Sequence, residues 1–117
     1  MRDRRRAEPQ GRRAETIAAW WLRLHGWRIL AMRARIPGGE VDLIARRGRT
    51  LAFVEVKARA TAAELDFAVD RHRLRRVAVA GERFAPRYAR PSDDIRIDVI
   101  LIAPRRLPLH ICNVWHG

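Results

Sequence analysis

Large apolar side chains recur at helical spacing near the start of the chain. They follow the i, i+3, i+4, i+7 pattern of a helix that buries one face, at positions Ile17, Trp20, Trp21 and Leu24. Gly26 follows shortly afterwards, and glycine is common just past the end of a helix. We therefore predict a helix from about Pro9 or Gly11 to His25, with the four large apolar residues on its buried face.

Between residues 38 and 57 the apolar positions change to the alternation of β-strands. Two alternating runs, 40–45 and 51–57, flank a short turn that contains Gly48, and together they predict a β-hairpin. Because side chains alternate faces along a strand, the polar residues of each run should share one face. These polar residues are Glu40 and Asp42 in the first run and Glu55 and Lys57 in the second. The apolar residues expected on the opposite face are Val41, Leu43 and Ala45, then Val54 and Val56.

The rest of the pattern predicts four further elements. They are strands over 27–35, 95–102 and 107–114 and a second helix over 67 to about 83, with connections at 58–66 and 86–91. The strand over 95–102 should lie inside the sheet. The order α-β-β-β-α-β-β predicts a single α/β domain over residues 1–117, with helices packed on a mixed β-sheet.

The hairpin carries acids where a buried strand would normally carry apolar residues. Antiparallel pairing brings Asp42 near Glu55 and Lys57. Two carboxylates roughly 5 Å apart repel by about 3 kcal/mol at an effective dielectric constant of about 20. A shared proton, a nearby cation or a bound metal must offset this repulsion. Carboxylate oxygens suit Mg²⁺ or Mn²⁺, so a metal site is one expectation for this hairpin.

Lys57 is distinguished by composition as well as by position. It is the single lysine among 25 basic residues, and all the others are arginines. Wherever the chain needs generic positive charge it uses arginine. A compact ammonium differs from a planar guanidinium in hydration, geometry and proton affinity. The sequence therefore indicates that this position requires an ammonium group, which could orient or activate a water beside a metal.

Two acids outside the hairpin, one in the first helix and one in an apolar strand, are also candidates for a specific role. Glu15, in the first helix, is either an acid favoured by the helix dipole or an active-site acid. Asp98 stands within the apolar strand over 95–102, where we expect an ion pair or hydrogen bond to a neighbouring element.

At these positions the sequence resembles a known family. Asp42 followed by Glu55-Val56-Lys57 is similar to the PD-(D/E)xK nuclease signature, and GGEVDLIA with LAFVEVKAR resembles the YraN family of small bacterial proteins. The resemblance runs from about Gly11 to Asp98. It implies the restriction-endonuclease-like fold, a three-layer αβββαβ core shared with archaeal Holliday junction resolvases.

The same resemblance implies a metal-dependent endonuclease acting on DNA. Asp42 and Glu55 would bind one or two Mg²⁺ or Mn²⁺ ions with the Val56 carbonyl, and Lys57 would position the nucleophile. Glu15 would complete the acidic cluster as a fourth catalytic residue. YraN-like sequences often carry a lysine near Arg73, where this chain has arginine, so a role tied to a lysine there is not carried over.

The net charge of +12 predicts an anionic partner, with nucleic acid ahead of a membrane surface. Residues 1–8 are rich in arginine and are expected to be a flexible basic arm or a frayed terminus. The arginines expected to contact phosphates are Arg59, after the hairpin, and Arg71, Arg73, Arg75 and Arg76 in the second helix. The alternative for these arginines is a solvated charged face.

The cysteine content and the hydropathy of the chain limit the compartments and partners that we expect. Cys112 is the single cysteine, so no intrachain disulfide can form, and no apolar run approaches the length of a membrane span. These features predict a cytoplasmic protein with no membrane partner. His110 and His116 lack recognisable metal-ligand spacing and are expected to be surface or hydrogen-bonded residues.

Three classes of function remain open on the sequence. The first is a nuclease of linear, branched or damaged DNA. The second is a non-catalytic nucleic-acid-binding protein that retains the nuclease fold, and the third is a basic scaffold whose acids form ion pairs. The presence of all the acids and of the single lysine favours the enzyme. Whether the substrate is DNA or RNA, and whether the protein is a monomer or a homodimer, stays open.

Overall fold

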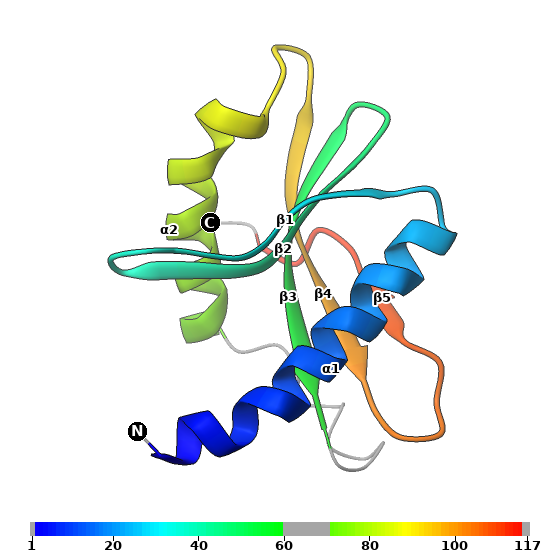
Figure 1. Ribbon diagram of the computed structural model, residues 1–117. Coiled ribbons are helices and arrows are strands. Elements are labelled where there is room, and N and C mark those ends of the chain that lie inside the picture. The colour runs from blue at the N-terminus through cyan, green and yellow to red at the C-terminus, as the bar shows by residue number, and fades with distance from the viewer. Residues whose placement is uncertain (1, 60–70, 116–117) are drawn as a thin grey trace.

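The computed structural model of the protein describes residues 2–59 and 71–115, with side chains from Arg12 onward. Two helices, α1 (Arg2–Leu24) and α2 (Arg71–Tyr88), cover opposite faces of one β-sheet (Figure 1). The element order is α-β-β-β-α-β-β, as the sequence predicts. The predicted α/β fold with a mixed sheet between helices is confirmed.

Five strands form the sheet in the order in which they occur along the chain. They are β1 (Arg28–Ile36), β2 (Gly39–Arg47), β3 (Thr50–Ala58), β4 (Asp94–Ile102) and β5 (Leu109–Ile111). All neighbours are antiparallel except β3 and β4, which run parallel. A parallel pair requires a crossover connection, and α2 lies within the one that joins these strands. The strand predicted over 95–102 is therefore interior, as expected.

A hydrophobic core lies on each face of the sheet. On the α2 side, Phe53 packs with Leu74, Val77 and residues of β4. Gly81 of α2 lies so close to the Phe53 ring that an added Cβ would be 3.2 Å from it. The α1 side is filled by Trp27, side chains of β2 and β3, and small residues of α1.

The helix α1 buries three alanines and Leu22, while three of the four large residues predicted to be buried are exposed, so the predicted buried face is wrong. Its buried positions are Ala14, Ala18, Ala19 and Leu22. Ile17 is 40% exposed, Trp20 58% and Leu24 77%. The indole of Trp27 already occupies this side of the sheet, and alanines let the helix backbone approach it closely. Available volume, and not hydrophobicity alone, decided which face of the helix is buried.

Both ends of α1 can be compared with the sequence. The helix begins at Arg2, ahead of the predicted start at Pro9 or Gly11, because arginine, alanine and glutamate before Pro9 are good helix formers. Flexibility of residues 1–8 stays a prediction. At the other end Gly26 has φ +89°, and its N–H donates to the Arg23 carbonyl at 3.1 Å. This is the left-handed glycine that the sequence predicts.

The helix α2 and the strand β5 depart from their predicted bounds. The helix continues through Pro86 to Tyr88, where a connection is predicted, because Phe84 and Tyr88 pack against the core and hold the last turn. The strand β5 covers only three residues of the predicted 107–114. Asn113, with φ +56°, turns the chain away soon after it ends. The loop predicted over 58–66 and the helix start at Phe67 lie largely outside the described residues.

Arg46 joins the end of β2 to the connection between α2 and β4. Its guanidinium donates to both Asp93 carboxylate oxygens, at 2.9 and 2.6 Å, and to the carbonyls of Gly48 and Tyr88. A buried guanidinium with this many acceptors is well compensated. The hairpin turn, α2 and β4 are therefore tied together at one end of the sheet.

Candidate active site

Asp42 lies just beyond the end of the β2–β3 ladder, at a break in the side-chain alternation of β2. The β2–β3 ladder runs from Arg47–Thr50 to Leu43–Val54 and stops there. Beyond it, the Asp42 carboxylate accepts a hydrogen bond of 2.7 Å from the Val56 N–H. A side chain thus replaces the backbone acceptor that a continuing strand would supply, and it fixes Asp42 against β3.

Side-chain alternation along β2 also breaks at Asp42. Val41 packs in the α2-side core, whereas Leu43 and Ala45 pack in the α1-side core. The prediction that these three residues share a face is therefore wrong for Val41. Across the sheet, β1 is irregular at the same level, because Arg33 has φ +53°. The break lets Asp42 interact with acids from both faces of the sheet.

The structure brings Asp42 and Glu55 into contact. Burial, followed by the negative charge of Glu55, raises the pKa of Asp42 from 3.8 to about 8. The hydrogen bond from Val56 opposes this rise, and the charge of Glu15 adds to it. Asp42 therefore holds a proton near neutral pH, because a second negative charge is costly beside a buried carboxylate.

Glu55 is almost completely buried and pairs with α2. Its carboxylate accepts hydrogen bonds from Arg73 Nε at 2.9 Å and forms an ion pair with Nη2 at 2.8 Å. The side chain of Arg73 is 48% exposed, so solvent weakens the pair. Arg73, predicted to contact phosphate, thus neutralises the central acid of this site.

Lys57 lies two residues after Glu55 in β3, so both residues are on the side of the strand that faces α2. It is 6% exposed and lies beside Leu101 of β4 in the parallel ladder. A lysine is rarely buried to this extent unless its ammonium has partners. The single lysine of the chain is therefore an internal residue beside Glu55 and no part of the solvated basic surface.

A small cavity of about 90 Å³ opens next to Asp42 between α1 and the hairpin. Glu15 lines it from the helix, as the sequence predicts for an acid at the site. Glu40 lines it as well, although it was not among the predicted site residues. Its position two residues before Asp42, on the same predicted face, was the signal that could have identified it.

Arginines compensate the two outer acids of the cavity. Glu15 pairs with Arg33 at 2.8 Å, and Glu40 lies 3.5 Å from Arg76 of α2. The second pair exists because Gly39 brings β2 against α2. A Cβ on Gly39 would lie 2.7 Å from the Arg76 carbonyl oxygen. Arg76 therefore reaches Glu40, an acid that lines the cavity together with three arginines, Arg12, Arg33 and Arg35.

The other arginines predicted to bind phosphate lie at different places. Arg71 stacks over Trp115 at 5.0 Å, and Arg75 is exposed on α2. Arg59 lies at the end of β3, where its backbone N–H donates to the Ile102 carbonyl at 2.9 Å. Of the predicted phosphate-binding arginines, Arg73 and Arg76 therefore contact the acids of the site, whereas Arg71 packs on Trp115 and Arg59 follows the end of β3.

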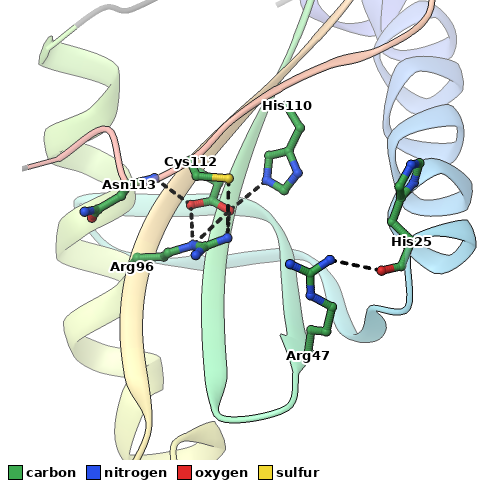
Figure 2. A network of polar contacts seen from close by, with 7 residues as sticks. His25, Arg47, Arg96, His110, Cys112 and Asn113 are labelled. Atoms are coloured by element: carbon green, nitrogen blue, oxygen red, sulfur yellow. Dashed lines mark hydrogen bonds and ion pairs between the residues drawn. The ribbon is translucent and has the colours of Figure 1, made fainter.

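A second polar network surrounds Asp98, which is fully buried (Figure 2). His110 lies 2.8 Å from its carboxylate, Arg96 Nε donates at 3.0 Å, and the Asn113 N–H at 2.9 Å. Burial would raise the pKa of Asp98, but these hydrogen bonds outweigh burial and lower it. The predicted partnering of Asp98 is confirmed, and this network fastens the C-terminal segment to β4.

The Asp98 network includes side chains able to bind a metal. Ligand atoms of Asp98, His110 and Cys112 lie within 4.8 Å of one another. Arg96 Nη2, however, donates to Cys112 Sγ at 3.4 Å and to Asp98 at 3.3 Å (Figure 2). The guanidinium thus supplies the positive charge within this group, and a hydrogen-bonded structural role accounts for it.

Comparisons with known proteins identify the family of the chain. The sequence profile of the uncharacterised protein family UPF0102 matches residues 14–102. A UPF0102 protein of Sphingopyxis alaskensis is 70% identical over 109 residues, covering 93% of this chain and 94% of its own length. One from Rhizorhabdus wittichii is 62% identical over 117 residues, covering 100% of this chain and 99% of its own. The resemblance to the YraN family is confirmed, since UPF0102 is that family. The chain belongs to the UPF0102 family.

Proposed function

We propose that this protein is a metal-dependent nuclease that hydrolyses DNA phosphodiester bonds, with branched or damaged DNA as candidate substrates. The observation that carries the proposal is the contact between the buried carboxyl groups of Asp42 and Glu55. Burying two acids against each other lowers the stability of a fold, and a function of the pair would account for its presence. Metal binding is a function that two adjoining carboxyl groups can serve, because divalent cations prefer oxygen ligands.

The residues present fit a divalent ion. Asp42 and Glu55 offer carboxylate oxygens, and the Val56 carbonyl, next to the Val56 N–H that holds Asp42, is the third expected ligand. Mg²⁺ and Mn²⁺ are the ions these oxygens favour. When bound, such an ion supplies charge neutralisation at a phosphate and lowers the pKa of water. Here a proton on Asp42 and the Arg73 guanidinium provide the compensation.

The chain's own residues would do the remaining work. Lys57, beside Glu55, would orient the attacking water and stabilise the negative charge that forms on it. Glu15 would share in the negative charge of the cavity from α1. The arginines of α2 would hold the phosphates on either side of the scissile bond. A cytoplasmic location, with access to chromosomal DNA, is part of this proposal.

A non-catalytic nucleic-acid-binding protein is the second candidate. The specific observation in its favour is the ion pair between Arg73 and Glu55, which satisfies the central acid without a metal. In that case Asp42 and Glu55 would be structural, and the basic surface alone would bind DNA.

A cleavage assay separates the two candidates. We expect the protein to cut one or more of a panel of linear, nicked and branched DNAs with Mn²⁺ or Mg²⁺, and to cut none in EDTA. Binding without cleavage, across all substrates and both metals, would assign the protein to the non-catalytic class.

Two variants test the assigned roles. Lys57→Arg keeps the charge but is bulkier and cannot readily lose a proton, so cleavage should be lost while DNA binding survives. Asp42→Asn should abolish cleavage yet tighten DNA binding, because it weakens the metal site and removes a potential negative charge. Glu82→Gln, an exposed acid of α2, is the control, and circular dichroism checks folding. Full activity in Lys57→Arg would remove Lys57 from the mechanism.

A further inference from the structure

A basic groove lies between α1 and the ends of β3 and β4. It has a volume of about 400 Å³ and is lined by Arg13, Arg59, Arg105 and Arg106, among others. Among the described residues that line it, every charged side chain is an arginine. Four guanidinium groups around one hollow repel each other, so the groove is complementary to a polyanion.

The floor of this groove is apolar. Ile17 from α1 and Ile102 from β4 contribute to it, next to the alanines at positions 58 and 103. Contact with phosphates alone would not need an apolar floor. Unpaired nucleotides present both a charged backbone and an apolar base face, whereas the bases of a duplex are stacked inside it.

An exposed apolar stripe on α1 extends from the groove. The stripe consists of Ile17, Trp20 and Leu24, which follow helical spacing and so share one face of the helix with Arg13. Trp20 is 58% exposed, and the Arg23 guanidinium lies 5.0 Å from its ring centroid. An exposed indole beside arginines is what proteins use to stack unpaired bases while holding the backbone.

The groove adjoins the candidate active site across α1. Arg12 and Glu15 line the cavity beside Asp42, whereas Arg13 and Ile17 line the groove. The groove and the cavity therefore lie on two sides of the same stretch of α1, residues 12–17. In Figure 1 α1 crosses the face of the sheet opposite α2, which keeps the groove away from the arginines of α2.

From these observations we propose that the groove of Arg13, Arg59, Arg105 and Arg106, with Trp20 at its edge, binds an unpaired stretch of DNA next to the active site. This inference rests on the proposed nuclease function and names its substrate class, DNA with a single-stranded segment. A second copy of this chain fits the stripe less well, because it would bring Arg13 and Arg23 of both copies together.

Binding in EDTA tests the groove independently of cleavage. We expect a fluorescein-labelled oligothymidine of about 12 nucleotides to bind more tightly than the same strand in a duplex. Trp20→Ala should weaken single-strand binding by roughly 5- to 150-fold, the range expected for one stacked base, and change duplex binding little. Leu109→Ala, which also removes an exposed apolar side chain, is the matched control and should change neither.

A second pair of variants tests the charges. Arg105→Asn with Arg106→Gln should weaken single-strand binding and lower its log–log salt slope by about 1.4. Asparagine suits position 105, where φ is +61°. The control, Arg28→Gln with Arg83→Gln, removes the same charge from exposed positions outside the groove.

Each outcome bears on one of the two proposals. Equal binding by wild type and Trp20→Ala, or an equal loss in the control pair, would overturn the groove. So would sedimentation showing a dimer that Trp20→Ala converts to monomers, since a second copy would then cover the stripe. A protein that prefers single strands but never cleaves would retain the groove and lose the nuclease.

Discussion

At the scale of single residues, Asp42 makes stability depend on pH. Its pKa is raised from 3.8 to about 8 by burial and by Glu55, so the folded protein holds a proton that the unfolded chain releases. The contribution of Asp42 to stability is therefore full below pH 3.8 and is lost as pH rises toward about 8. For this group alone, the free energy of unfolding should fall by up to about 1.4 kcal/mol per pH unit in that window.

Urea unfolding of wild type and Asp42→Asn across this window measures the effect. Asparagine cannot ionise, so the variant should lose this component of the slope and gain stability relative to wild type toward pH 8. Asp93→Asn is a control of opposite sign, because hydrogen bonds from Arg46 lower the pKa of Asp93 to about 2. Asp93 stabilises above its unfolded pKa and loses this contribution as pH falls toward 2. Parallel wild-type and Asp42→Asn curves would mean that Asp42 is ionised in the folded protein.

At the scale of elements, α1 gives the clearest test of which side chains support the fold. Leu22 is 1% exposed against the sheet, while Trp20 is 58% exposed. Leu22→Ala should lower the free energy of unfolding by about 2–5 kcal/mol, as buried leucines do. Trp20→Ala should change it by no more than about 0.5 kcal/mol, despite removing a larger side chain. Thermal and urea unfolding measure both. If Trp20→Ala lowered the free energy of unfolding more than Leu22→Ala does, the face predicted from periodicity would be the buried one.

At the scale of the whole molecule, a net charge of +12 predicts salt-dependent binding to DNA. If about six arginines contact phosphates, log K against log salt should have a slope near −5 for duplex DNA. Replacing Arg71 and Arg75 by alanine should flatten this slope by about two while circular dichroism stays unchanged. Arg73 is left in place because it pairs with Glu55. A slope near zero in the wild type would argue against any nucleic-acid partner.

In the described parts of the chain, no helix is long and apolar enough to cross a membrane.

Several features follow from the sequence by itself. Alternation and turn glycines determined the hairpin of β2 and β3, and helical spacing determined that α1 and α2 exist. Antiparallel pairing through a short turn was enough to predict that Asp42 and Glu55 meet. These patterns are readable because each depends on neighbours within a few residues of the chain.

Other features were decided only by the tertiary structure. Periodicity gives a helix an apolar face but does not say whether large or small side chains fit the sheet, and Trp27 left room for alanines. The break at Asp42 depends on β1 and on the end of the β3 ladder. The Arg73–Glu55 pair joins residues 18 positions apart, and the basic groove joins α1 to β4. Such contacts depend on volume and on long-range placement, which local sequence patterns do not contain.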